Sequence, residues 1–310
     1  MIKKYKEFIF EDEDDDGGTS SASTSTSTDT SFKGRFEKFK EFLAKKSTGS
    51  GSSASSSPTD GSAPRTYTSG SGDFSNVDVM IETVVSYLIK HGITNPIVQR
   101  AILATIGKES GFTATKEASY KTTSPSRIKQ IFGSRFSNLS DEEINRIKQD
   151  DTAFWEKVYG GEWGKKNLGN TQPGDGAKYL GRGFNGITGR ANYQTYTDML
   201  RKAGSSVDLI SNPEILEKNP NVSAEVNALY FLRGLSDPNI KRKYGNSNPN
   251  DFKNFDTALK AVVNANAGSG TDITKGFAKV SYDAAVAANN KLGSKFEKAI
   301  SSSPDTSNIA

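Results

Sequence analysis

Two glutamates, Glu109 and Glu117, have the type and spacing that acid–base chemistry requires. Glu109 follows the run AILATIGK, and Glu117 comes eight residues later, after the turn SGFTATK. At a helix end a carboxyl group meets the negative end of the helix dipole and partial burial, and both favour its protonated form. A protonated carboxyl and an ionised one that flank a glycosidic bond can hydrolyse it with a water. By spacing alone, a glutamate at a helix end is more often structural or solvated.

The glycine-rich stretch GDGAKYLGRGFNGITGRANY carries side chains suited to sugar recognition. Sugar hydroxyls and acetamido groups pair with amides and hydroxyls, and pyranose faces pack on aromatic rings. The polar side chains of the stretch that could bind a sugar are Arg182, Asn185, Thr188 and Asn192, and its aromatic side chains are Tyr179, Phe184 and Tyr193. Gly181, Gly183 and Gly186 formally match a dinucleotide-binding fingerprint. No apolar strand precedes them and no helix start follows, so nucleotide binding is not expected.

These segments resemble glycoside hydrolase family 19, specifically its phage and bacterial lysozyme-like members. The resemblance rests on NTQPGDGAKYLGRGFNGITGRANY at 170–193 and ATIGKESGF at 104–112, and it covers roughly residues 75–300. The family pattern is approximately GDG…Y.GRG..Q.TGR.NY after an upstream HESGGF. The resemblance implies a mainly α, lysozyme-like two-lobed domain with a glycine-rich segment that is irregular or forms short strands. It also implies inverting hydrolysis of peptidoglycan or chitin.

The resemblance assigns roles by position. Glu109 matches the general acid, Glu117 matches the second glutamate, which activates the water, and Thr188 matches the hydroxyl residue that helps to hold this water. Asn192 and Asn264, the latter in AVVNANAG, match substrate-contacting amides. The full set of expected substrate-binding residues is Arg182, Asn185, Asn192, Tyr193 and Asn264. Two carboxyls and a water suffice for this chemistry, so no cofactor and no metal are expected.

The chain departs from the family pattern at three places. Lys108 replaces the common histidine before the acid, and one glycine is missing after it. Because successive helix residues lie about 100° apart, the amine of Lys108 need not face the same site as Glu109. Gly186 stands where the family normally has a glutamine that contacts substrate or water. This third departure predicts reduced or altered activity unless Asn185 substitutes for the glutamine.

The composition divides the 310 residues into a biased N-terminal quarter and a folded remainder. Residues 17–31 and 47–72 are almost entirely Ser, Thr, Gly and Ala, which cannot bury enough apolar surface to fold. We expect residues 1–72 to form a disordered, low-complexity tether with two short amphipathic islands at 2–16 and 31–46. The second island either packs on the main domain or serves as a docking peptide. Residues 73–300 form the expected catalytic domain and 301–310 a flexible tail.

Apolar periodicity predicts a chain of helices beyond the tether. The first has Ser75 or Asp73 as its N-cap and Gly92 at its stop position, and the second begins at Asn95-Pro96 and ends before Gly111. Residues 160–189 show little helical character, and strand signals are few. Further helices are expected at 140–159, 190–203, 221–234, 251–264 and 275–299.

Charge and composition exclude several classes of function. A net charge of +4 is mild for this length, so a nucleic-acid partner is not expected. The chain has no cysteine, and its one histidine, His91, is interpreted as a residue near a helix C-terminus. Neither a transmembrane segment nor a signal peptide is recognised.

These features favour a lysozyme-type peptidoglycan hydrolase, a phage lysin associated with the virion or held in the host cytoplasm before lysis. Residues 1–46 would then dock it to a phage structural protein. Two alternatives remain at this stage. One is a chitinase acting on polymers of β-1,4 N-acetylglucosamine, and the other is a catalytically weakened, glycan-binding component of the virion.

Overall fold

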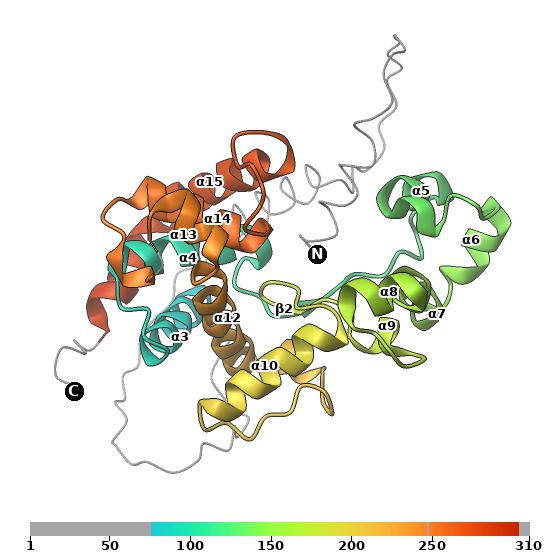
Figure 1. The fold of residues 1–310 in the computed structure, drawn as a ribbon, viewed down its shortest axis with the longest axis horizontal. Coiled ribbons are helices and arrows are strands. Elements are labelled where there is room, and N and C mark those ends of the chain that lie inside the picture. Colours follow the sequence, from blue (N-terminus) through green and yellow to red (C-terminus); the bar gives the residue numbers. More distant parts are fainter. Residues whose placement is uncertain (1–75, 247, 304–310) are drawn as a thin grey trace, which may run out of the picture. The chain divides into compact units, whose positions relative to one another are not determined.

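The computed structural model describes residues 76–246 and 248–303, which form a mainly α fold (Figure 1). The helices are α3 Val77–Lys90, α4 Pro96–Ser110, α5 Pro125–Phe132, α6 Asp141–Ile147, α7 Asp151–Tyr159, α8 Gly161–Leu168, α9 Asp175–Lys178, α10 Arg190–Lys202, α11 Ile215–Lys218, α12 Pro220–Leu235, α13 Pro238–Tyr244, α14 Phe255–Ala267 and α15 Gly276–Ser302. Two short strands, β1 Thr115–Lys116 and β2 Arg182–Gly183, pair antiparallel. The predicted mainly α class is confirmed. The expected tether, with both of its islands, lies outside the described residues.

Helix α4, which carries Glu109, begins and ends where its local signals predict. The Asn95 side chain accepts a hydrogen bond from Ile97 N at 2.9 Å, and Pro96 occupies the first turn. Gly111 ends the helix with a φ of 58°, a left-handed conformation that favours glycine. Helix α3 differs from the prediction, because its N-cap is Asn76 rather than Ser75 or Asp73. His91 lies at its C-cap, as expected.

The core around α4 fixes the position of its C-terminal turn. Residues 101–108 of α4 are all buried, and α14 and α15 pack along the helix (Figure 1). Helix α12 packs on α3 and α14, so these five helices share the largest cluster of buried apolar side chains. A helix enclosed in this way has little freedom to shift. Glu109 therefore stands at the end of a rigid element.

Two further clusters of buried apolar side chains each include residues of the glycine-rich region. One is aromatic and comes mainly from α5 and α7. The other contains Tyr179 and Tyr193, which are both fully buried. Phe184 is buried as well, in the cluster around α4. The three aromatics expected to pack against sugar rings are therefore core residues, and that expectation is wrong.

The region 160–189 is more ordered than its composition suggests. It contains α8 and α9, so the expectation of little helical character is wrong for these two segments. In β2, Arg182 pairs with Lys116 of β1, and Arg182 also exchanges backbone hydrogen bonds with Ile187. Residues 182–187 therefore form a tight loop that is anchored at both ends.

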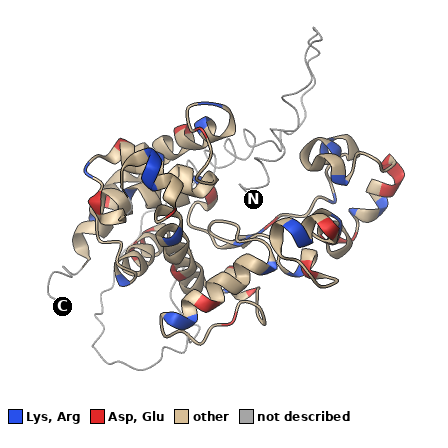
Figure 2. Ribbon diagram, viewed as in Figure 1, with Lys and Arg blue, Asp and Glu red and all other residues tan. Residues whose placement is uncertain are grey.

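Other boundaries differ for local reasons. The single helix expected at 140–159 is two helices, because Asp150 caps α7 by accepting a hydrogen bond from Thr152 N at 2.8 Å. Helix α15 runs to Ser302, two residues into the expected tail. Helices α5, α11 and α13 were not predicted. Acidic and basic residues are interspersed along the described helices (Figure 2).

An ion pair ties the glycine-rich segment to α10. Arg190 donates to both carboxylate oxygens of buried Asp175, at 2.6 and 2.7 Å. Burial alone would raise the pKa of Asp175, but the hydrogen bond from Arg190, with further hydrogen bonds from Gln172 and Thr171, holds it below its ordinary value of 3.8. The pair therefore stabilises the fold fully above about pH 4. This contribution is lost as the pH falls through the lower pKa of the folded state.

Replacing Asp175 with Asn should lower the free energy of unfolding by about 3 kcal/mol at pH 7, because it breaks a buried ion pair. Urea denaturation at pH 7 and at pH 3 measures the effect, which should shrink at pH 3. Asp198→Asn is the matched control, since Asp198 pairs with Arg201 on the exposed face of α10 and should cost under about 1 kcal/mol. Equal losses in the two variants would contradict a special role for the Asp175 pair.

Candidate active site

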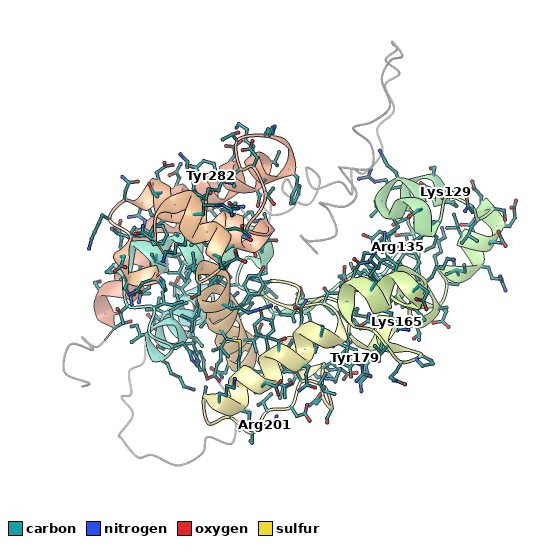
Figure 3. All side chains as sticks on the ribbon, viewed as in Figure 1. Lys129, Arg135, Lys165, Tyr179, Arg201 and Tyr282 are labelled. Atoms are coloured by element: carbon teal, nitrogen blue, oxygen red, sulfur yellow. The ribbon has the colours of Figure 1, made fainter. Side chains whose placement is uncertain are left out.

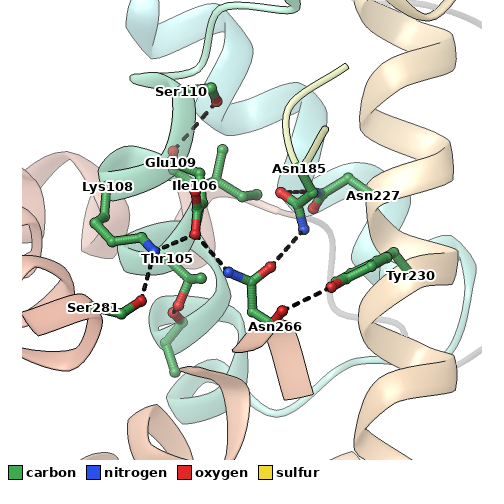
Figure 4. A network of polar contacts seen from close by, with 11 residues as sticks. Thr105, Ile106, Lys108, Glu109, Ser110, Asn185, Asn227, Tyr230, Asn266 and Ser281 are labelled. Carbon is green, nitrogen blue, oxygen red and sulfur yellow. Dashed lines mark hydrogen bonds and ion pairs between the residues drawn. The ribbon is translucent and has the colours of Figure 1, made fainter. Parts of the chain in front are cut away.

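Glu109 lies in the last turn of α4, with its side chain 17% exposed (Figure 4). Two groups contact its Oε1 atom. The Asn266 Nδ2 atom donates to it at 2.7 Å, and the Lys108 ammonium forms an ion pair with it. The carboxyl is therefore held in one orientation while part of it remains open to solvent. This is the setting expected for a group that exchanges a proton with a bound substrate.

Lys108 shares this site. Its side chain is 1% exposed, and its Nζ atom donates to Ser281 Oγ of α15 at 2.7 Å as well as contacting Glu109. The sequence left open whether the amine faces the site, and the structure shows that it does. A flexible four-carbon stem lets the ammonium reach its neighbour although the two Cβ atoms point in different directions. The Lys108 ammonium therefore lies directly against the carboxyl group of Glu109.

A chain of amides leads from Glu109 to the glycine-rich segment (Figure 4). Asn185 Nδ2 donates to Asn266 Oδ1 at 3.4 Å, and Asn227 Nδ2 donates to Asn185 Oδ1 at 2.7 Å. The Tyr230 hydroxyl donates to the backbone oxygen of Asn266 at 3.2 Å. Burial, with the Glu109 charge adding to it, raises the pKa of Tyr230 well above its ordinary value, so this hydroxyl stays a neutral donor. Asn185, a predicted site residue, is thus joined to Glu109 through Asn266.

Glu117 follows β1 and is almost completely buried. Its Oε2 atom accepts a hydrogen bond from Gly181 N at 2.8 Å, and its Oε1 atom accepts one from the Tyr159 hydroxyl. Its backbone N–H also donates to Gly181 O at 2.9 Å. An ionised carboxylate has about four acceptor positions, so two donors leave capacity for a water.

Gly181 lets Glu117 and Thr188 approach the same point. A Cβ atom at position 181 would lie 3.0 Å from Glu117 Oε2 and 3.1 Å from Thr188 Oγ1. The Thr188 hydroxyl donates to Gly186 O at 2.8 Å, and Asn192 Nδ2 donates to Thr188 O at 2.8 Å. Thr188 therefore lies close to Glu117, and Asn192 contacts the backbone of Thr188. The absence of a side chain at Gly181 keeps the space between the carboxylate and the hydroxyl open.

Gly186 has a φ of 60°, a left-handed conformation. Any residue with a Cβ atom would be strained there, so glycine suits this turn. Its carbonyl serves the site by accepting the Thr188 hydroxyl. The neighbouring Asn185 supplies an amide that contacts Asn266. The amide at 185 thus takes part in the site, whereas position 186 contributes only backbone.

Arg182 and Tyr193 were expected to bind substrate, and their burial argues against direct contact. Arg182 is 6% exposed, and its Nη1 atom donates to Lys178 O at 2.7 Å and to the Tyr193 hydroxyl at 3.3 Å. The Tyr193 hydroxyl donates to Leu180 O at 2.8 Å, and burial raises the pKa of this tyrosine. Both side chains donate hydrogen bonds to backbone carbonyls of the glycine-rich segment and so stabilise its conformation.

Asn264 also differs from its expected role. It is fully buried, and its Nδ2 atom donates to Gly268 O at 2.9 Å and Thr271 O at 3.0 Å. Asn266, which the sequence did not single out, makes the contact with Glu109 instead. Two positions along a helix rotate a side chain by about 200°, so the two asparagines face opposite ways. Repetition of the amide in NAN was the one signal available for Asn266.

The two asparagines should respond differently to substitution. Asn266→Ala removes a hydrogen bond to Glu109 and should lower activity about tenfold with a small change in stability. Asn264→Ala leaves loop carbonyls unpaired and should cost about 2 kcal/mol of stability, with near-normal activity per folded molecule. Rates of reducing-end release and urea denaturation, measured on both, separate the roles. If Asn264→Ala lowered activity and Asn266→Ala lowered only stability, Asn264 rather than Asn266 would belong to the active site.

A pocket of about 420 Å³ opens beside this constellation. The glycine-rich segment, α10, α12 and the end of α14 line it, and its wall includes Asn185, Thr188, Asn192 and Asn266. Three predicted site residues therefore reach one pocket. The other predicted site residues, Glu109, Glu117, Arg182, Tyr193 and Asn264, are not part of its wall.

Within residues 76–246 and 248–303, no group of three His, Asp or Glu side chains is placed to hold a metal ion. In the same ranges, no helix is long and apolar enough to cross a membrane. Comparison of the chain with known proteins found no matching family model and no matching curated protein.

Proposed function

We propose that this chain is a lysozyme-type peptidoglycan hydrolase that cleaves β-1,4 glycosidic bonds with inversion. The observation that carries the proposal is that Glu109 and Glu117 are both tied to one glycine-rich segment. Glu117 binds Gly181 N directly, and Glu109 reaches Asn185 through Asn266. A pocket lined by amides and a hydroxyl lies against the same segment. These are the parts that a two-carboxylate mechanism needs.

In this mechanism Glu109 donates its proton to the glycosidic oxygen as the bond to the anomeric carbon breaks. Glu117 removes a proton from a water that attacks this carbon from the opposite face of the ring. Glu109 ends as a carboxylate and Glu117 as a carboxylic acid, and exchange with solvent restores both. The Lys108 ammonium stabilises the carboxylate left on Glu109, because the charges are adjacent.

Product analysis on purified peptidoglycan tests the proposal. We expect new reducing ends, and nuclear magnetic resonance of early products should show the α-anomer first. The alternative substrate, chitin, is assayed in parallel. Cleavage of chitin alone would make the chain a chitinase. Failure to release reducing ends from either polymer would reject hydrolysis.

A second candidate is a glycan-binding protein that no longer cuts. Gly186 favours it, because position 186 offers a substrate only backbone where the resembled family has a glutamine side chain. Sedimentation with peptidoglycan, without release of reducing ends, is the result that this candidate predicts.

Association with a phage particle belongs to the same proposal. The enzyme would be carried on the virion, or kept in the host cytoplasm until lysis, and residues 1–46 would dock it to a structural protein. Deletion of residues 1–72 should then leave hydrolysis intact and abolish incorporation into particles. Packaging of the truncated chain would contradict the docking role.

A further inference from the structure

The wall of the pocket near Glu109 contains polar side chains beyond those predicted to bind sugar. Asparagine amides lie at several points of its wall, at positions 167, 185, 192 and 266. An acetamido group needs one donor and one acceptor, and an asparagine amide supplies both. The volume of about 420 Å³ lies within the roughly 300–1,000 Å³ typical of small-ligand sites. One acetamido sugar with a substituent would fit such a space.

The charged side chains in the wall of this pocket are Arg233 and Asp237. Asp237 has a structural task, because its Oδ1 atom accepts a hydrogen bond from Asn239 N at the start of α13 at 2.8 Å. Arg233 is exposed near the end of α12. Among the ion pairs of the described ranges, none joins Arg233 to a carboxylate.

Tyr196 lies beside Arg233 in the pocket wall. Burial raises the pKa of Tyr196, and a hydrogen bond and positive charge from Arg233 oppose this rise. Tyr196 is itself part of the wall and is almost fully buried. A neutral hydroxyl therefore lies next to the guanidinium of Arg233. The other donors of its planar fork stay available for an anion, and a carboxylate matches their geometry.

We propose that this pocket is a subsite for an acetamido sugar that carries a carboxylate, with Arg233 as the residue that pairs with the carboxylate. The inference rests on the proposed function and favours peptidoglycan over chitin within it, because chitin has no carboxylate. In peptidoglycan the acid belongs either to a lactyl ether without peptide or to the peptide stem. Asn266 and Thr188 join this subsite to the catalytic residues.

Binding to the full-length Glu109→Gln variant tests the proposal without turnover. Four probes are compared by calorimetry: N-acetylglucosaminyl-N-acetylmuramic acid, its Ala-Glu dipeptide, the same dipeptide with both carboxyls amidated, and N,N′-diacetylchitobiose, the neutral chitobiose unit of chitin. We expect one acidic probe to bind about tenfold more tightly than chitobiose, as a charged hydrogen bond provides. Preference for the free disaccharide identifies the lactyl carboxylate, and preference for the unamidated dipeptide identifies the stem.

Substitutions at Arg233 complete the test. Arg233→Gln, added to the Glu109→Gln variant, should bring all four probes to the affinity of chitobiose, and Arg233→Lys should keep part of the preference. Arg201→Gln is the matched control, because this arginine lies on α10 (Figure 3). It is exposed and pairs with Asp198, and neither residue is part of the pocket wall. This variant should leave the preference intact.

Two outcomes would overturn the inference: equal binding of acidic and neutral probes, or a preference that survives Arg233→Gln. The result is independent of hydrolysis. If the wild-type chain cleaves neither polymer and the acidic preference is present, the proposed function fails and the subsite stands. If the chain cleaves peptidoglycan and Arg233 does not affect binding, the subsite fails and the proposed function stands.

Discussion

Replacing Glu109 with Gln is expected to lower peptidoglycan hydrolysis by about 10²–10⁴-fold, the usual contribution of a positioned acid. Glutamine has nearly the shape of glutamate, and its oxygen can still accept the hydrogen bond from Asn266. It has no proton to give to the leaving oxygen. The rate of reducing-end release gives the activity, and thermal unfolding followed by circular dichroism verifies that the variant is folded.

The leaving group provides a sharper test of the same role. An aryl glycoside with an acidic phenol as leaving group needs little protonation, so its cleavage should fall much less in Glu109→Gln than cleavage of the polymer. Glu142→Gln is the matched control, because this glutamate lies on the exposed face of α6 and should leave both rates unchanged. Polymer cleavage at the wild-type rate in Glu109→Gln would remove Glu109 from the mechanism.

Local signals were sufficient to place the helix of the acid. Asn95-Pro96 starts α4 and Gly111 stops it, because capping and left-handed turns depend on residues only a few positions apart. The mainly α class followed in the same way from apolar periodicity. The break at Asp150 was also a local cap, hidden within a stretch whose helical character continued on both sides.

Contacts between distant segments account for the errors at the site. Lys108 is enclosed because α15 brings Ser281 to it, 173 positions along the chain. Asn266 rather than Asn264 meets Glu109, because the packing of α14 on α4 selects one face of the helix. Periodicity shows that a helix has a buried face, but it does not show which element covers that face.

The glycine-rich segment shows both a feature set by local sequence and one set by contacts between distant segments. Gly186 and its left-handed backbone are explained by the turn itself. The burial of Tyr193, in contrast, depends on a cluster that α10 and α12 build together. Aromatic rings near polar residues therefore suggested a sugar platform where the fold uses them as core.

Replacing Glu117 with Gln is expected to reduce hydrolysis by a similar factor, about 10²–10⁴, because the attacking water loses its base. Glu117 accepts hydrogen bonds from Gly181 N and the Tyr159 hydroxyl, and a glutamine oxygen can meet only one of these donors well. A stability loss of about 1–3 kcal/mol is therefore expected too. Rates are normalised to the folded fraction found by urea denaturation, which separates the two effects.

Azide distinguishes a base from a structural carboxylate at position 117. In Glu117→Ala, the freed space admits azide, a nucleophile that needs no base, so cleavage should recover in part and yield a glycosyl azide of inverted configuration. Tyr159→Phe removes one donor but keeps the carboxylate, and it should cost about tenfold or less. If Glu117→Gln cleaves normally per folded molecule, or azide restores nothing, then Glu117 only supports Gly181. Another group would then have to activate the water.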